Sequence, residues 1–131
     1  MLLMTREKDW LQYSEELLEI ANLLIDNKKF SWACFTLQQA SAAALKSILA
    51  KHDEMTFGDN LIKLARTIAE TETIPVDVKS SCLKLNDLFT RARDLETKPN
   101  GTPSNNYTIR EANDTKNKTL VIIRYAHHLN H

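Results

Sequence analysis

The run FTLQQASAAALKSIL, residues 35–49, places two adjacent glutamines and four alanines among large apolar side chains. No glycine or proline interrupts the first 57 residues, so the run can lie within one helix over residues 31–51. Apolar residues cover nearly all sides of such a helix and leave only a narrow polar stripe through Gln39 and Lys46. Because a helix of this kind must be covered by neighbours, we predict that it lies at the centre of a helical bundle.

The sequence on either side supplies the neighbouring helices. Residues 6–26 repeat apolar side chains at three- and four-residue steps, which predicts an amphipathic helix. The same steps recur over residues 78–92, and Pro75 just before them suits the first turn of a helix. These two segments therefore predict one helix before the central one and another after it.

Capping signals and a loop mark the remaining helices. Thr56 with Asp59 resembles a capping box that uses a shorter acid, and Thr108 with Glu111 has the full capping-box pattern. The segment KPNGTPSNN, residues 98–106, has the composition of a loop. The predicted helices cover residues 6–26, 31–51, 61–68, 75–93 and 108–128.

Five helices with short connections predict an all-α fold, an antiparallel up-and-down bundle of four long helices plus one short helix. The segment TLVIIRY, residues 119–125, has enough β-branched residues for a strand, but no second run is available to pair with it. A length of 131 residues fits one domain, which we expect to span residues 1–131.

Composition narrows the possible environments and partners. The 17 basic and 17 acidic side chains cancel, which argues against tight nonspecific binding to nucleic acid. No segment approaches the ~18 apolar residues of a membrane span, so we expect no membrane partner and a cytoplasmic location. Cys34 and Cys82 lack metal-ligand spacing and fall at apolar helix positions, so we expect two buried, reduced thiols.

The central helix also carries a family resemblance. QQASAAALKSIL, residues 38–49, is similar to the second-helix motif of the HEPN domain (higher eukaryotes and prokaryotes nucleotide-binding), in its small archaeal and bacterial form. Gln38, Gln39, Ala40, Leu45 and Lys46 match that motif, while the next position after Ser41 holds an alanine where the family usually has an acid.

Three further segments resemble the family more weakly. In GDNLIKL, residues 58–64, Asp59 stands where the family has a histidine. In LNDLFTRARD, residues 85–94, Arg93 alone remains of an Arg-Tyr-Pro tripeptide. Tyr107, followed by Glu111 and an alanine, matches the opening of the family's last helix.

The resemblance implies a symmetric dimer whose cleft, lined by the fourth helix, holds a nucleotide-like anion or RNA. Many relatives act with a minimal nucleotidyltransferase as a two-part, toxin–antitoxin-like system, so such a protein is an expected partner. The candidate ligand-binding residues are Arg93, Gln39, Lys46, Asp59 and Tyr107. Three of them also have a plain structural interpretation: Gln39 and Lys46 as a solvent-facing stripe, and Arg93 as a helix-end residue.

Other relatives are metal-independent ribonucleases that use an arginine followed closely by a histidine, in which the arginine binds phosphate and the histidine moves protons. After Arg93, the positions for that histidine hold Lys98, Pro99 and Asn100. Arg124 and His131 have the spacing, but they lie at the end of the chain. We therefore assign no catalytic residue, and a noncatalytic binding module is our first hypothesis, with a ribonuclease and a plain helical scaffold as alternatives.

No cofactor or metal is expected. His127 and His131 are spaced to share one face of a helix, but no third ligand has a known position.

Overall fold

The computed structural model describes residues 6–52, 58–96 and 107–130, with the backbone alone for residues 89–96. Every element in these residues is a helix, and they contain no strand. In chain order the helices are α1 (Arg6–Asp26), α2 (Phe30–Lys51), α3 (Leu61–Ile68), α4 (Val76–Glu96) and α5 (Ile109–Leu129). Four of them have 21 or 22 residues and α3 has 8, which confirms the predicted bundle for the described part of the chain.

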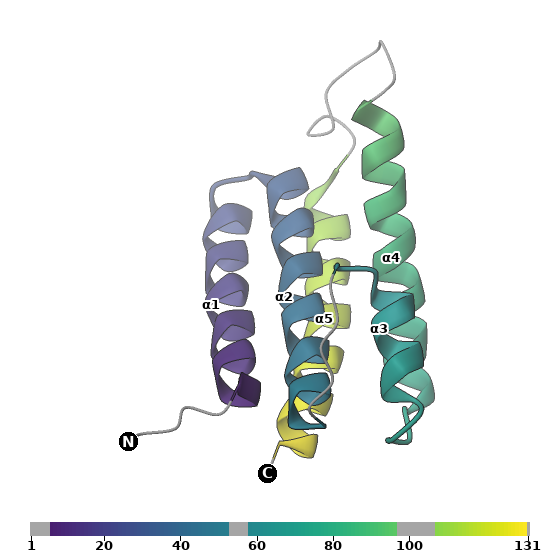
Figure 1. Ribbon diagram of the computed structural model, residues 1–131. Helices are drawn as coiled ribbons and strands as arrows, with labels where there is room; N and C mark the ends of the chain where they lie inside the picture. Colours follow the sequence, from purple (N-terminus) through teal and green to yellow (C-terminus); the bar gives the residue numbers. More distant parts are fainter. Residues whose placement is uncertain (1–5, 53–57, 97–106, 131) are drawn as a thin grey trace.

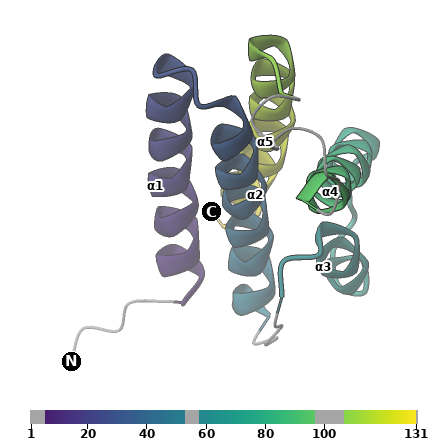
Figure 2. The same cartoon turned by 90° about the horizontal axis from the view of Figure 1, so that it is seen from above.

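Helix α2 lies at the centre of the molecule. Figure 1 shows α1 on one side of it, α5 behind it, and α4 with the short α3 on the other side. The view from above in Figure 2 gives the same arrangement. Among the described residues, α2 contacts each of the other helices. The prediction of one uninterrupted central helix is confirmed, and the helix begins one residue earlier than predicted, at Phe30.

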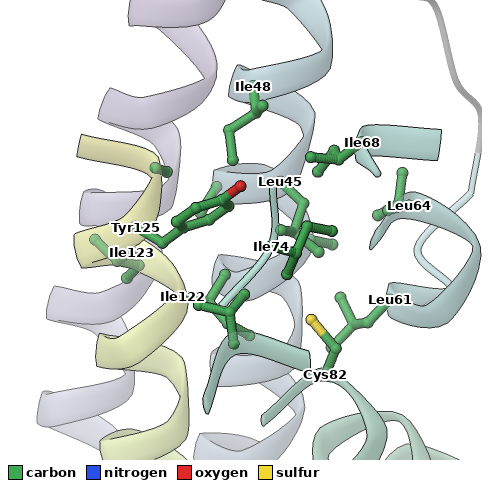
Figure 3. Packing of buried hydrophobic residues seen from close by; sticks show 14 of the residues in the cluster. Leu45, Ile48, Leu61, Leu64, Ile68, Ile74, Cys82, Ile122, Ile123 and Tyr125 are labelled. Atoms are coloured by element: carbon green, nitrogen blue, oxygen red, sulfur yellow. The ribbon is translucent and has the colours of Figure 1, made fainter. Parts of the chain in front are cut away.

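The main core forms where α2 meets α3, α4 and α5, as Figure 3 shows. Leu45 and Ile48 of α2 are fully buried there, together with Leu61 of α3, Cys82 of α4 and Ile122 of α5. Removing large aliphatic side chains from water is the main source of stability for such a bundle. Helices α2, α3, α4 and α5 therefore share one continuous apolar core, and α1 packs against it through partly buried leucines.

Both cysteines are buried thiols outside any disulfide, as the sequence predicts. Cys34 contacts the hydroxyl of Thr115 on α5, with 3.6 Å between the sulfur and the oxygen. Burial raises the pKa of Cys82 to about 12. Both side chains thus serve as small core residues, and the Cys82 thiol stays protonated near neutral pH.

A tight turn joins α1 to α2. Lys28 adopts φ 60°, the left-handed conformation that ends many helices. The Lys29 N–H donates to the Leu24 carbonyl at 2.8 Å, and the Lys28 N–H donates to the Ile25 carbonyl at 3.0 Å. This pair of hydrogen bonds is a Schellman motif, which stops α1 and reverses the chain so that α2 runs antiparallel to it.

The starts of α3 and α5 test the two predicted capping boxes. The Asn60 side-chain oxygen accepts hydrogen bonds from the N–H groups of Ile62 and Lys63 at 3.0 and 3.1 Å, so Asn60 caps α3. The predicted helix over residues 61–68 is confirmed, but the predicted cap at Thr56 and Asp59 is wrong, and Thr56 itself lies outside the described residues. At α5, the Thr108 hydroxyl accepts from the N–H of the residue three positions later at 3.2 Å, which confirms that cap.

The contact between α1 and α2 is made by small side chains. Ser14 and Ala21 of α1 are completely buried against α2, and the Ser14 hydroxyl donates to the Ala40 carbonyl at 2.7 Å. Small residues let the two helices approach closely, so Tyr13 and Ile20 of α1 lie beside this contact, while two leucines of α1 pack, partly buried, against the main core. Tyr13 and Ile20 are 47% and 46% exposed.

The exposed side of α2 differs from the predicted one. Trp32 and Phe35 are 62% and 46% exposed, and their rings meet edge to face with centroids 6.4 Å apart. Gln39 and Lys46 lie on the same side of the helix but are half-buried. The predicted solvent-facing polar stripe is therefore wrong for Lys46, whose side chain is only 14% exposed. We call Tyr13, Ile20, Trp32 and Phe35 the aromatic face.

Candidate functional site

The two glutamines of α2 belong to a polar network with the segment before α3. The Gln39 amide donates to the Gln38 side-chain oxygen at 2.8 Å, and the Gln38 amide donates to the Asp59 backbone carbonyl at 2.8 Å. The Lys46 ammonium binds the Asp59 carboxylate, also at 2.8 Å. We call these four residues the Gln–Asp–Lys network. It brings together three of the five candidate ligand-binding residues, namely Gln39, Lys46 and Asp59.

The partners of Lys46 within the protein limit what it can bind. Besides the Asp59 carboxylate, its ammonium lies over the ring of Trp10, 5.1 Å from the ring centre. A cation that is held by a carboxylate and an aromatic face is already largely neutralised. Within the chain, the network therefore fastens the segment before α3 to the middle of α2, and an anion could reach Lys46 only by competing with Asp59.

Tyr107 lies elsewhere, in a small cavity near the start of α2. It is 8% exposed, and the cavity has a volume of about 30 Å³ with Ser31 and Cys34 of α2 and Leu88 of α4 in its walls. That volume holds a water molecule or two and is far below the few hundred Å³ of a small-molecule site. Gln38 also lines the cavity, so it connects the Tyr107 region with the Gln–Asp–Lys network.

Arg93 lies in the last turns of α4, where only the backbone is described. Leu88 of α4 and Ser31 of α2 are level with each other, because they line the same cavity. At a rise of 1.5 Å per residue, Arg93 lies about 7 Å beyond that level along α4. Lys46 lies about 22 Å from the same level along α2, in the opposite direction. The fold of the chain therefore does not bring Arg93 to the Gln–Asp–Lys network.

A charged groove between α4 and α5 was not predicted. Its volume is about 300 Å³, and Lys84 and Asp87 of α4 face Asp114 and Lys118 of α5 across it, with Glu111 at one end. The signal in the sequence is the spacing of charged residues by three and four along both helices. Mixed charge of this kind does not select an anion by itself, since the groove is lined by more carboxylates than ammonium groups.

No group of three or more histidine, cysteine or acidic side chains is placed to hold a metal ion within the residues that the structure describes. His127 instead contacts Glu15 and so joins α5 to α1, while His131 lies outside the described residues. In the same residues, every helix is too short or too polar to cross a lipid bilayer.

In the described residues, four helices pack around the alanine-rich helix α2 and its two adjacent glutamines, and they define a small all-α domain in which polar side chains join the helices. The sequence pattern of the HEPN domain matches residues 7–129. The chain therefore belongs to the HEPN domain family, as its second-helix motif predicts.

Solved structures give the same result. The chain is similar to a protein of Thermus thermophilus with a TM-score of 0.88 and 25% identity, over 96% of this chain and 99% of that one. An archaeal HEPN homologue aligns with a TM-score of 0.76 and 25% identity over 94% and 96% of the two chains. A HEPN domain protein of Thermotoga maritima aligns with a TM-score of 0.75 and 26% identity over 92% and 96%. No curated protein sequence matches the chain significantly.

Proposed function

We propose that the protein is a noncatalytic HEPN module that acts as a homodimer and binds a nucleotide-like anion, either free or presented by a minimal nucleotidyltransferase partner. The aromatic face supports this proposal best. Trp32 and Phe35 on α2, with Tyr13 and Ile20 on α1, expose large apolar surface on adjoining helices. Aromatic side chains grouped in this way are typical of protein interfaces, and a second copy of the chain is the partner that we expect.

A dimer would also bring the candidate residues closer together. Within one chain, the α4 position of Arg93 lies beyond the level of the start of α2, whereas the Gln–Asp–Lys network lies at the middle of α2 and after it. A two-fold axis perpendicular to the helices reverses their direction, so each α4 end would move toward the level of the network of the other copy. Gln39, Lys46, Asp59, Tyr107 and Arg93 remain the residues that we propose for the shared site.

The positions of the histidines support binding rather than cleavage. His52 pairs with Glu72 at 2.9 Å, and His127 contacts Glu15. None of the described histidines lines the α4–α5 groove or the Tyr107 cavity. His127 is about 27 Å along α5 from its first residue, so within one subunit it is remote from the α4 end that carries Arg93.

Nucleotide titration tests the binding proposal. We expect ATP or a related nucleotide to bind the dimer in calorimetry and Arg93→Ala to weaken binding tenfold or more, because a charge-assisted bond to phosphate is worth roughly 1.5–3 kcal/mol. Arg91→Ala, which removes the same charge from the same helix turn, should change affinity by less than about twofold. Absence of binding by any nucleotide, with no effect of Arg93→Ala, would leave only a helical scaffold.

Two further experiments separate the alternatives. Purified protein incubated with RNA in the presence of a chelator should leave the RNA intact, and cleavage that Arg93→Ala abolishes would instead establish a ribonuclease. If a minimal nucleotidyltransferase is encoded in the neighbouring reading frame, the two proteins should co-purify from the same cells. Failure to co-purify would restrict the proposal to a free nucleotide.

A further inference from the structure

A second pocket lies between α3 and α4, with a volume of about 270 Å³. Its walls are almost entirely apolar: Ala65 of α3, Ile74 of the α3–α4 connection and Leu83 of α4 contribute to them. Leu83 remains 57% exposed at the edge of the pocket. None of the residues that line the pocket belongs to the Gln–Asp–Lys network, the aromatic face or the α4–α5 groove.

Two cations, and no carboxylate, line this pocket. Arg66 comes from the last turn of α3 and Lys79 from the first turns of α4. Both are exposed, and neither forms an ion pair with any residue that the structure describes. Lys46, in contrast, is paired with Asp59. The α3–α4 pocket therefore combines an apolar interior with uncompensated positive charge at its rim.

We propose that the α3–α4 pocket binds a small apolar carboxylate, with the hydrocarbon part against Ala65, Ile74 and Leu83 and the carboxylate between Arg66 and Lys79. Burial of the hydrocarbon supplies the affinity, since exposed ion pairs are weak. The guanidinium of Arg66 can form a bidentate pair of hydrogen bonds with a carboxylate, which supplies the selectivity for an acid.

The size and chemistry of the pocket define the ligand further. A volume of about 270 Å³ equals that of roughly nine water molecules at about 30 Å³ each, so the ligand has on the order of ten non-hydrogen atoms. The walls offer too few polar groups to satisfy a nucleobase, which argues against a nucleotide at this place. Cys82 contributes a thiol to the pocket, and its raised pKa of about 12 keeps it neutral beside an anion.

Octanoate is a suitable probe, with octanol as the uncharged control and acetate as the control without a hydrocarbon tail. We expect octanoate to bind the full-length protein in calorimetry, octanol to bind about fivefold more weakly or worse, and acetate not to bind. In NMR spectra, the Ala65 and Leu83 methyl signals should shift with octanoate. Binding of octanol as tight as that of octanoate, or no binding of octanoate at millimolar concentration, would overturn the proposal.

Variants locate the binding. Arg66→Gln combined with Lys79→Gln should weaken octanoate binding about tenfold, and Ala69→Phe, at an exposed position of the pocket wall, should block it. Lys63→Gln removes an exposed charge one turn earlier on α3, outside the pocket, and should leave binding unchanged. If the double variant binds octanoate as tightly as Lys63→Gln does, the two cations do not contribute and the binding is nonspecific. If the methyl signals shift with protein concentration instead of octanoate concentration, the pocket is a contact between protein molecules. Either result would overturn the proposal.

Discussion

Gln38 links α2 to the segment before α3. It is 2% exposed, its amide donates to the Asp59 carbonyl, and its side-chain oxygen accepts from Gln39. A buried polar side chain is tolerated only when its hydrogen-bonding groups are satisfied, and here a backbone carbonyl and a neighbouring amide satisfy them. The two adjacent glutamines therefore act as one unit, in which Gln39 orients Gln38 and Gln38 holds the segment before α3.

Replacing Gln38 with alanine should lower the free energy of unfolding by about 2 kcal/mol, because the Asp59 carbonyl loses its partner and a small cavity forms. Gln39→Ala, at a half-buried position, should cost less than about 1 kcal/mol. Urea unfolding followed by circular dichroism measures both. Equal costs for the two variants would show that the bond to Asp59 contributes little.

At the scale of elements, α4 and α5 each bury one group that must stay protonated. Cys82 of α4 lies in the core, and burial raises its pKa to about 12. Tyr125 of α5 donates its hydroxyl to the Thr73 carbonyl at 2.9 Å. Burial, and secondarily the negative charge of Glu72, raises the pKa of Tyr125. Both groups lose their proton more easily in the unfolded chain than in the folded one.

The contribution of these two groups to the free energy of unfolding should therefore be constant below about pH 9 and fall above it. In that range the unfolded Cys82 has released its proton while the folded thiol retains it, so each pH unit favours unfolding by up to about 1.4 kcal/mol. Cys82→Ala should remove this slope, and Tyr125→Phe should remove the smaller slope due to the phenol. Urea unfolding at about pH 7 and about pH 10.5 tests this, and an unchanged slope in Cys82→Ala would contradict it.

At the scale of the whole molecule, the aromatic face and the α3–α4 pocket are two separate surfaces. The aromatic face lies on α1 and α2, whereas the pocket lies between α3 and α4, the two helices that Figures 1 and 2 show across α2 from α1. Two copies joined through the aromatic face would leave both pockets accessible. Dimer formation and carboxylate binding can therefore be tested independently.

We predict that Trp32→Asp combined with Phe35→Asp converts the proposed dimer to a monomer without unfolding it, since both side chains are about half exposed or more in the single chain. Val76→Asp is the matched control, because Val76 is an equally apolar residue, 82% exposed, at the start of α4. Sedimentation equilibrium measures the mass of each variant. A wild-type monomer at all concentrations, or a dimer that persists in the double variant, would contradict the role of the aromatic face.

The helices and the family could be predicted because their signals are local. Residues 6–26 repeat apolar side chains every three or four positions, Thr108 caps the helix that follows it, and QQASAAALKSIL carries the family motif. Local signals failed at α3, where Asn60 and not Thr56 caps the helix. Both residues favour helix starts, and the choice depends on where the chain leaves α2.

The candidate site was less predictable, because its partners are distant in sequence. Gln39 and Lys46 were expected to face solvent, and nothing near them in sequence indicates that Asp59 covers Lys46. In the same way, periodicity identified the apolar residues of α1 but did not show that Ser14 and Ala21, and not Tyr13 and Ile20, make the buried contact. Which side of an apolar helix is covered depends on how closely its neighbour approaches.

The sequence by itself determined the helical elements, their order and the family, because backbone hydrogen bonds within helices and apolar periodicity act over a few residues. Only the tertiary structure decided which charges are neutralised, which aromatic rings stay exposed and where an apolar pocket with free cations lies. Those properties depend on contacts between residues far apart in the chain, and such contacts exist only once the helices have packed.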